Sequence, residues 1–225
     1  MPIFKHLTQF FKPQTKVDIS VDKNNSKMTY LVVGLGNKGE KYDHTRHNVG
    51  RQIVASLMSD LGESSVYNQK IDALIADFVY DGQKVVALLP ENYMNNSGVS
   101  VRHYLNFFKD TYCIVVVHDE LDLPLGKIKL SHSKNAGGHN GVQSVFDQTS
   151  KMPYDILRVR VGIGPNDTAG EKIRQMRKFQ TKNFVLGQFT VSEEVDLREA
   201  QTKAIAVLKT LLSKGEESAQ KTLNN

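Results

Sequence analysis

A histidine and an aspartate stand where they could act together on a proton. His47 lies in the segment Thr-Arg-His-Asn at the beginning of a predicted helix, and Asp119 follows an apolar run. The helix dipole disfavours a positive charge at this end, so it keeps the imidazole neutral and able to accept a proton. An aspartate bonded to the other ring nitrogen would fix the tautomer and stabilise the imidazolium formed in the reaction. The pair predicts general base catalysis, with His47 as the base and Asp119 as the group that orients it.

Three asparagines, Asn37, Asn95 and Asn140, occur in loops that follow other predicted strands or precede helices. A primary amide both donates and accepts hydrogen bonds, so it can hold a peptide backbone or donate toward a developing oxyanion. The sequence contains no Gly-x-Ser-x-Gly nucleophile elbow. The single cysteine, Cys113, lies in an apolar run where an inert thiol is expected. Direct attack by an activated water is the reaction that this set of residues favours.

Two other kinds of site match parts of the sequence. Residues 34–39 fit the Gly-x-Gly-x-x-Gly dinucleotide fingerprint, but the helix begins late and no acidic residue ends a second strand at the required distance. A zinc ion could be held by three histidines and an aspartate, namely His44, His47, His118 and Asp119. No HExxH motif or cysteine ligand set accompanies them. We therefore expect no cofactor and no metal, and a metal-dependent hydrolase stays open as an alternative.

The elements that must position these residues alternate between strands and helices. Apolar runs predict strands over 29–33, 71–80, 84–89, 112–117, 127–130 and 155–161, and Asp81-Gly82 predicts a tight hairpin. Helical spacing predicts helices over 45–61, 97–108 and 140–149, and a last helix that begins with a Thr190–Glu193 capping box, ends at Gly215 and buries Val195. The alternation predicts an α/β fold, a three-layer sandwich with a mixed, mostly parallel central sheet flanked by helices. Ligands bind beyond the carboxyl ends of the strands in such sheets, where the histidine, aspartate and asparagines would meet.

The composition fits one globular domain with a distinct N-terminal segment. Residues 1–27 carry apolar residues at helical spacing and then a polar stretch, and we expect a loosely ordered extension rather than a targeting leader or membrane-surface helix. Residues 28–225 are expected to form a single α/β domain. The net charge of +5 is compatible with a polyanionic partner but does not establish one. No apolar stretch approaches the roughly 20 residues that span a bilayer, so we expect no membrane partner. One cysteine excludes an internal disulfide framework, and we therefore expect a cytoplasmic protein.

A series of motifs, in order along the chain, closely resembles the bacterial-type peptidyl-tRNA hydrolases. The resemblance covers about Met28 to the C-terminus. The motifs are Leu-Val-Val-Gly-Leu-Gly-Asn37, Thr-Arg-His47-Asn48, Tyr-Met-Asn95-Asn-Ser-Gly98, His-Asp119-Glu-Leu-Asp-Leu-Pro124, Ala-Gly-Gly-His-Asn140-Gly, Arg158-Val-Arg-Val-Gly-Ile-Gly164 and Phe184-Val-Leu-Gly187. The sequence departs from the family pattern at Lys38, Tyr93 and Asn96, which leaves the candidate catalytic pair unchanged.

The resemblance implies a monomeric enzyme that hydrolyses the ester between a peptide and the 3′ end of tRNA and so returns the tRNA to translation. It implies that His47 is the base, that Asp119 is its partner, and that Asn37 checks for a blocked amino group. It further implies that Asn95 donates to the oxyanion. The implied substrate-binding residues are Tyr42, Tyr93, Asn95 and Asn140. The residues implied to contact phosphates are Lys129 and Arg158. A non-enzymatic RNA-binding adaptor on the same scaffold is the alternative function.

Overall fold

The computed structural model of the protein describes residues 29–108, 112–132, 134–165 and 178–224. The expected N-terminal extension, residues 1–27, lies outside the described residues. Among the helices of these ranges, none combines the length and the apolar character that crossing a membrane requires.

Seven strands form one mixed sheet in the order β2-β3-β4-β1-β5-β7-β6. The four inner strands β4, β1, β5 and β7 run parallel, whereas β2 and β3 pair antiparallel at one edge and β6 pairs antiparallel with β7 at the other. The strands are β1 (Thr29–Gly34), β2 (Val66–Asn68), β3 (Ala73–Tyr80), β4 (Gln83–Pro90), β5 (Tyr112–Pro124), β6 (Ile128–Ser131) and β7 (Ile156–Gly164). The predicted α/β class and mixed, mostly parallel sheet are confirmed.

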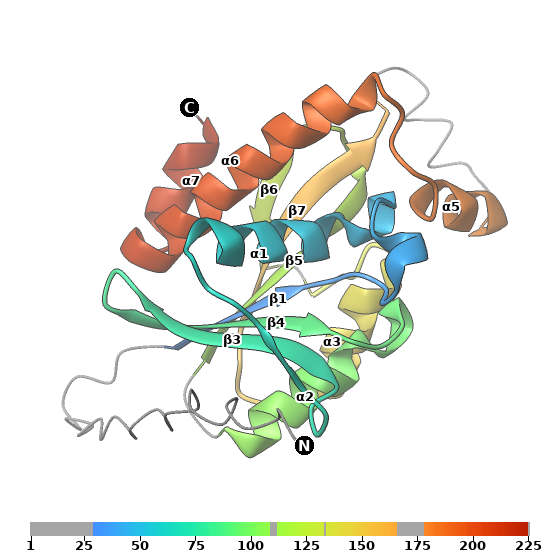
Figure 1. Cartoon of the computed structure of the whole chain (residues 1–225). Coiled ribbons are helices and arrows are strands. Elements are labelled where there is room, and N and C mark those ends of the chain that lie inside the picture. Colours follow the sequence, from blue (N-terminus) through green and yellow to red (C-terminus); the bar gives the residue numbers. More distant parts are fainter. Residues whose placement is uncertain (1–28, 109–111, 133, 166–177, 225) are drawn as a thin grey trace, which may run out of the picture.

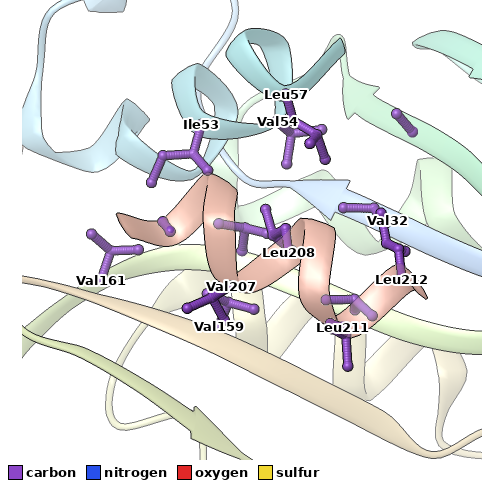
Figure 2. Packing of buried hydrophobic residues seen from close by; sticks show 14 of the residues in the cluster. Val32, Ile53, Val54, Leu57, Val159, Val161, Val207, Leu208, Leu211 and Leu212 are labelled. Carbon is purple, nitrogen blue, oxygen red and sulfur yellow. The ribbon is translucent and has the colours of Figure 1, made fainter. Parts of the chain in front are cut away.

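Helices cover both faces of the sheet, which makes the predicted three layers (Figure 1). On one face lie α1 (Val49–Asp60), α6 (Glu193–Lys214) and α7 (Glu216–Asn224), and on the other lie α2 (Ser97–Phe107) and α3 (Asn140–Thr149). Alternate residues of the inner strands feed two separate buried clusters, because successive side chains of a strand point to opposite faces. In the first cluster, Leu208 and Leu211 of α6 pack between α1 and the sheet (Figure 2).

The turns and caps follow the sequence signals closely. Asp81 and Gly82 join β3 to β4 with φ of 48° and 75°, as expected for the tight hairpin. The Thr190 N–H donates to Glu193 Oε2 over 2.7 Å, and the Glu193 N–H donates to Thr190 Oγ1 over 3.3 Å, which confirms the capping box. Gly215, with φ of 79°, ends α6 as predicted. The predicted burial of Val195 is wrong, since it is 52% exposed, and α7 was not predicted.

The first helix begins later than predicted, and the difference positions the site. Arg46–Asn48 form a 3-10 turn, and α1 follows from Val49. Gly50 lets α1 lie directly on β5, because a Cβ at this position would stand 2.2 Å from the Val117 carbonyl oxygen. This close approach brings the turn that carries His47 to the middle of β5, next to Asp119.

Candidate active site

A cavity of about 560 Å³ opens beyond the carboxyl ends of β1 and β4 and beside residues 119–121 of β5, a strand that continues to Pro124. The segments after β1 and β4, the second half of β5 and the beginning of α3 supply most of its wall, close to the place expected for this sheet type. It brings together seven of the nine candidate site residues: Asn37, Tyr42, His47, Tyr93, Asn95, Asp119 and Asn140.

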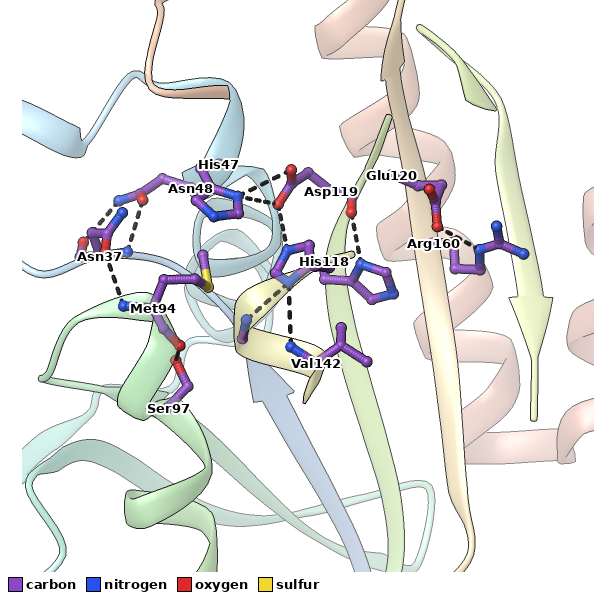
Figure 3. A network of polar contacts seen from close by, with 12 residues as sticks. Asn37, His47, Asn48, Met94, Ser97, His118, Asp119, Glu120, Val142 and Arg160 are labelled. Carbon is purple, nitrogen blue, oxygen red and sulfur yellow. Dashed lines mark hydrogen bonds and ion pairs between the residues drawn. The ribbon is translucent and has the colours of Figure 1, made fainter. Parts of the chain in front are cut away.

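His47 and Asp119 form a hydrogen-bonded pair inside this cavity (Figure 3). His47 Nδ1 lies 2.9 Å from Asp119 Oδ1 and 3.1 Å from Oδ2, and the two residues are 8% and 3% exposed. A carboxylate only accepts hydrogen bonds, so Nδ1 carries the hydrogen and the neutral ring has its lone pair on Nε2. The geometry therefore leaves Nε2 as the basic atom.

The charge of Asp119 decides the protonation of His47. Burial lowers the pKa of the His47 imidazole. The Asp119 charge and its hydrogen bond together raise this pKa by more than burial lowers it, so the pKa lies above the ordinary value. Burial raises the pKa of the Asp119 carboxyl, and the two histidines beside it, His47 and His139, reverse this and hold it well below its usual range. The aspartate thus stays ionised and stabilises a proton on His47.

His139 is a member of the site that the sequence reasoning missed. Its Nε2 donates to Asp119 Oδ1 over 2.8 Å, while its Nδ1 accepts from the N–H groups of Gly141 and Val142 at 3.1 and 3.2 Å. Its ring centroid lies 4.8 Å from that of His47. His139 follows two glycines and precedes Asn140, and a histidine in a glycine-rich loop has no sequence signal that distinguishes it from an ordinary loop residue. One carboxylate therefore accepts from two histidines.

The set of zinc ligands considered from the sequence is not brought together. His44 is exposed, and the buried His118 donates from Nδ1 to the Asp119 carbonyl oxygen over 2.6 Å. A different trio, His47, Asp119 and His139, has ligand-type atoms within 4.8 Å of one another. Hydrogen bonds within this trio already account for the orientation of both rings toward the carboxylate. A metal ion bound through these atoms would have to break those hydrogen bonds.

Asn37 is held at three atoms, which defines the direction of its amide (Figure 3). Asn48 accepts from the Asn37 N–H over 2.8 Å and donates to the Asn37 carbonyl over 2.9 Å. The Met94 N–H donates to Asn37 Oδ1 over 2.9 Å. Because Oδ1 must face this donor, the NH₂ group of Asn37 is left to donate to a ligand in the cavity. Asn48 is a second site residue that the sequence reasoning did not single out.

The other predicted cavity residues are more open to solvent. Asn95 lies in the 3-10 turn Met94–Asn96, Asn140 begins α3, and both are exposed. Tyr42 is half-buried and Tyr93 exposed at the cavity rim. Exposed polar and aromatic side chains around a concave site are suited to contacting a ligand.

The two basic residues assigned to phosphates lie elsewhere. Lys129 is exposed on β6 and does not line the cavity. Arg158 is only 2% exposed on β7, with its guanidinium 5.9 Å from the Phe146 ring, and burial lowers its pKa. The expected phosphate contact by Arg158 is therefore corrected, because β5, β6 and α3 enclose this position of an inner strand. A strand-face pattern alone could not show this, because α3 covers the face on which Arg158 lies.

One wall of the cavity comes from α5 (Lys178–Val185) and the residue after it, which the sequence did not predict. Thr181, Lys182, Val185 and Leu186 line this wall, and Leu121 adds apolar surface from β5. The helix is short and mostly polar, so no apolar periodicity announced it. The His47–Asp119 pair thus lies between polar loops and a partly apolar wall.

Comparisons with known proteins agree on one family. Residues 31–225 match the family model described as peptidyl-tRNA hydrolase. The chain is 35% identical to the peptidyl-tRNA hydrolase of Lactiplantibacillus plantarum over 190 residues, which are 84% of this chain and 96% of that protein. It is 38% identical to that of Methylocella silvestris over 194 residues, which are 85% and 91% of the two chains. The crystal structure of peptidyl-tRNA hydrolase from Acinetobacter baumannii is similar with a TM-score of 0.75 and 30% identity, over 88% of this chain and 95% of that one.

Proposed function

The chain belongs to the peptidyl-tRNA hydrolase family, and from that premise we propose how its cavity cleaves the ester between a peptide and the 3′ end of tRNA. It is an enzyme that hydrolyses peptidyl-tRNA, since the family model and relatives matched over most of their length carry this activity in their names. The observation that carries the residue assignments is the buried pair of His47 and Asp119 at the cavity.

His47 acts as the general base in this proposal. Its Nε2 takes a proton from a water molecule as the water oxygen forms a bond to the ester carbonyl carbon. The π electrons of the carbonyl bond move onto the carbonyl oxygen, which becomes the oxyanion. When the tetrahedral intermediate collapses, the bond to the ribose oxygen breaks and the imidazolium returns its proton to that oxygen. Asp119 stabilises the imidazolium between these steps, and the hydrogen bond from His139 holds the carboxylate in place.

The asparagines and tyrosines bind the substrate around this pair. Asn95, exposed to the cavity, donates to the oxyanion, which is the interaction that strengthens as negative charge develops. The NH₂ group of Asn37 donates to the acyl carbonyl of a blocked amine and meets a free ammonium group unfavourably, since both would be donors. Asn140, Tyr42 and Tyr93 contact the peptide and the terminal nucleotide.

The remaining assignments concern the partner and the setting. Exposed Lys129 contacts a tRNA phosphate, an electrostatic contact that the net charge of +5 would reinforce. Action as a monomer is part of this proposal. Peptidyl-tRNA arises in translation, and so the proposed location is the cytoplasm.

The test is release of the acyl group from tRNA in the presence of EDTA. We expect the purified protein to cleave N-acetyl-aminoacyl-tRNA and to spare the same aminoacyl-tRNA with a free amine. Loss of cleavage in EDTA, restored by added metal, would support the metal-dependent alternative and contradict the water activation proposed for His47. Tight tRNA binding without cleavage under any of these conditions would support the adaptor alternative, which has no need of a buried histidine–aspartate pair.

A further inference from the structure

We propose that Arg46, the residue before the proposed base, is a positioning residue that holds α5 as a wall of the cavity and so sets the affinity for the acyl part of the substrate. The inference rests on the proposed function, because it takes the acyl group of a peptidyl-tRNA as the occupant of this part of the cavity.

The guanidinium of Arg46 is buried against the segment that follows α5. Arg46 is 6% exposed, and its Nη1 donates to the Gln188 carbonyl oxygen over 2.5 Å. Its Nη2 donates to Glu193 Oε2 over 2.7 Å. A buried charge is costly unless it is paired and hydrogen-bonded, so these contacts define where the segment can lie.

Two aromatic rings complete the enclosure of this guanidinium. Its central carbon lies 4.5 Å from the ring centroid of Phe184 on α5 and 5.0 Å from that of Phe189. Arginine combines this stacking with a planar set of donors, whereas lysine offers a single compact charge. The interaction therefore depends on the shape of the side chain as well as on its charge.

The partner carboxylate is fixed from the other side. Burial raises the pKa of the Glu193 carboxyl, but hydrogen bonds from Thr190 and Arg46 outweigh it and hold the pKa below its ordinary value. The Thr190 N–H and hydroxyl both donate to Glu193 Oε2, at 2.7 and 2.8 Å. Oε2 of Glu193 therefore accepts hydrogen bonds both from Thr190, in the capping box of α6, and from the Arg46 guanidinium.

The main chain makes the same connection. The Arg46 N–H donates to the Gly187 carbonyl oxygen over 3.0 Å, and Thr45 forms an isolated antiparallel bridge with Gln188. The turn that carries His47 and the segment after α5 are therefore joined through both the backbone and the Arg46 side chain. Leu186, next to Gly187, lines the cavity.

The chemistry of the wall indicates which part of the substrate it meets. The α5 wall is mixed: Thr181 and Lys182 are polar, whereas Val185 and Leu186, together with Leu121 from β5, present apolar surface to the cavity. Phosphates are bound mainly by lysine, arginine and main-chain N–H groups, whereas apolar peptide side chains gain from burial against other apolar groups. Val185 and Leu186 directly precede Gly187, whose carbonyl oxygen accepts from the Arg46 N–H, so Arg46 positions the apolar end of this wall and should act on the binding of acyl groups according to their size.

The experiment compares Arg46→Lys with the wild-type protein on two substrates that share one tRNA, N-acetyl-glycyl-tRNA and N-acetyl-phenylalanyl-tRNA. We expect KM for the phenylalanyl substrate to rise about tenfold, as losing a charged hydrogen bond and its stacking would predict, and KM for the glycyl substrate to rise less than about twofold. The kcat values should stay near those of the wild type, because His47 and Asp119 are unchanged. Arg198→Lys is the matched control, an exposed arginine paired with Glu194 over 3.8 Å on α6, and should leave both KM values unchanged.

A second variant keeps the test decisive if Arg46→Lys folds poorly. Glu193→Gln removes the charge from the partner and should produce the same selective rise in KM, by about threefold. An equal rise for both substrates, a fall in kcat at constant KM, or no change in KM in a folded variant would overturn the role of Arg46. Failure of the wild-type protein to cleave either substrate would instead remove the proposed function itself.

Discussion

At the scale of single residues, the site is organised around the Asp119 carboxylate. It accepts hydrogen bonds from His47 and His139, and its charge outweighs the helix N-terminus that was expected to keep His47 neutral. A full negative charge at hydrogen-bond distance interacts more strongly than the partial charge at a helix end, worth about 0.3–1 kcal/mol at exposed positions. His47 is therefore a stronger base than an unperturbed histidine. It becomes neutral, and so able to accept a proton, only when the pH exceeds its raised pKa.

The variant Asp119→Asn tests this electrostatic assignment through pH. In the wild-type protein, kcat/KM should rise with pH as His47 loses its proton, with the midpoint above the ordinary histidine pKa. Without the carboxylate charge the pKa of His47 falls, so the midpoint should move to lower pH. The plateau should also fall by about two to four orders of magnitude, since nothing then stabilises the imidazolium. The measurement is kcat/KM across the pH range, and an unmoved midpoint would contradict the pairing.

The sequence predicted the centre of the site better than its surroundings. His47, Asp119 and Asn37 could be found because polar residues that follow apolar runs gather near the carboxyl ends of the inner strands, although β5 continues past Asp119 to Pro124. His139 and Asn48 act through other site residues, and their types alone do not distinguish them from a loop histidine and a helix cap. Arg158 was misplaced because the pattern of a strand shows which residues share a face but not what covers it.

At the scale of elements, close contacts between backbones position the loops of the site. Gly98, at the beginning of α2, lies against α3, where an added Cβ would stand 2.1 Å from the Ser144 carbonyl oxygen. The Gly98 N–H also donates to Ser144 Oγ over 3.0 Å. The turn bearing Asn95 and the N-terminus bearing Asn140 belong to these two helices or their immediate approaches. Their relative position therefore depends on the absence of a side chain at Gly98.

Gly98→Ala should push α2 and α3 apart. We expect a loss of about 1–3 kcal/mol in the free energy of unfolding, typical of overpacking a close contact. KM should rise as well, because Asn95 and Asn140 are displaced from one another. Chemical denaturation and steady-state kinetics would show both effects, and unchanged stability would mean that the helices have room for the methyl group. Gly39→Ala, where a Cβ would meet nothing but φ is 99°, measures the separate cost of backbone strain without a steric clash.

At the scale of the whole molecule, two buried clusters support one sheet, and the cavity lies toward the carboxyl ends of its inner strands. Leu208 of α6 is fully buried in the cluster between α1 and the sheet and does not line the cavity (Figure 2). The layers follow from alternating apolar patterns, which is why the fold class was predictable. The α5 wall and α7 were not, because both are short helices whose largely polar sequences lack a strong apolar stripe. The extent of the domain toward residue 28 stays a prediction.

Leu208→Ala should therefore affect stability without changing the chemistry. A buried leucine replaced by alanine costs about 2–5 kcal/mol through lost burial and the cavity left behind. The free energy of unfolding should fall by this amount, while kcat per folded molecule at low temperature stays near the wild-type value. A large fall in kcat in the folded variant would show that the core and the site are coupled more strongly than their separation indicates.

The central claim is that His47 activates water for hydrolysis of the ester, and His47→Ala tests it most directly. The measurement is single-turnover release of the acyl group from N-acetyl-aminoacyl-tRNA by a variant whose folding and substrate binding are verified independently. We predict that the cleavage rate falls by at least about two orders of magnitude, as expected for loss of a general base, while the substrate still binds. A folded His47→Ala variant that cleaves at a rate close to that of the wild type would contradict the account.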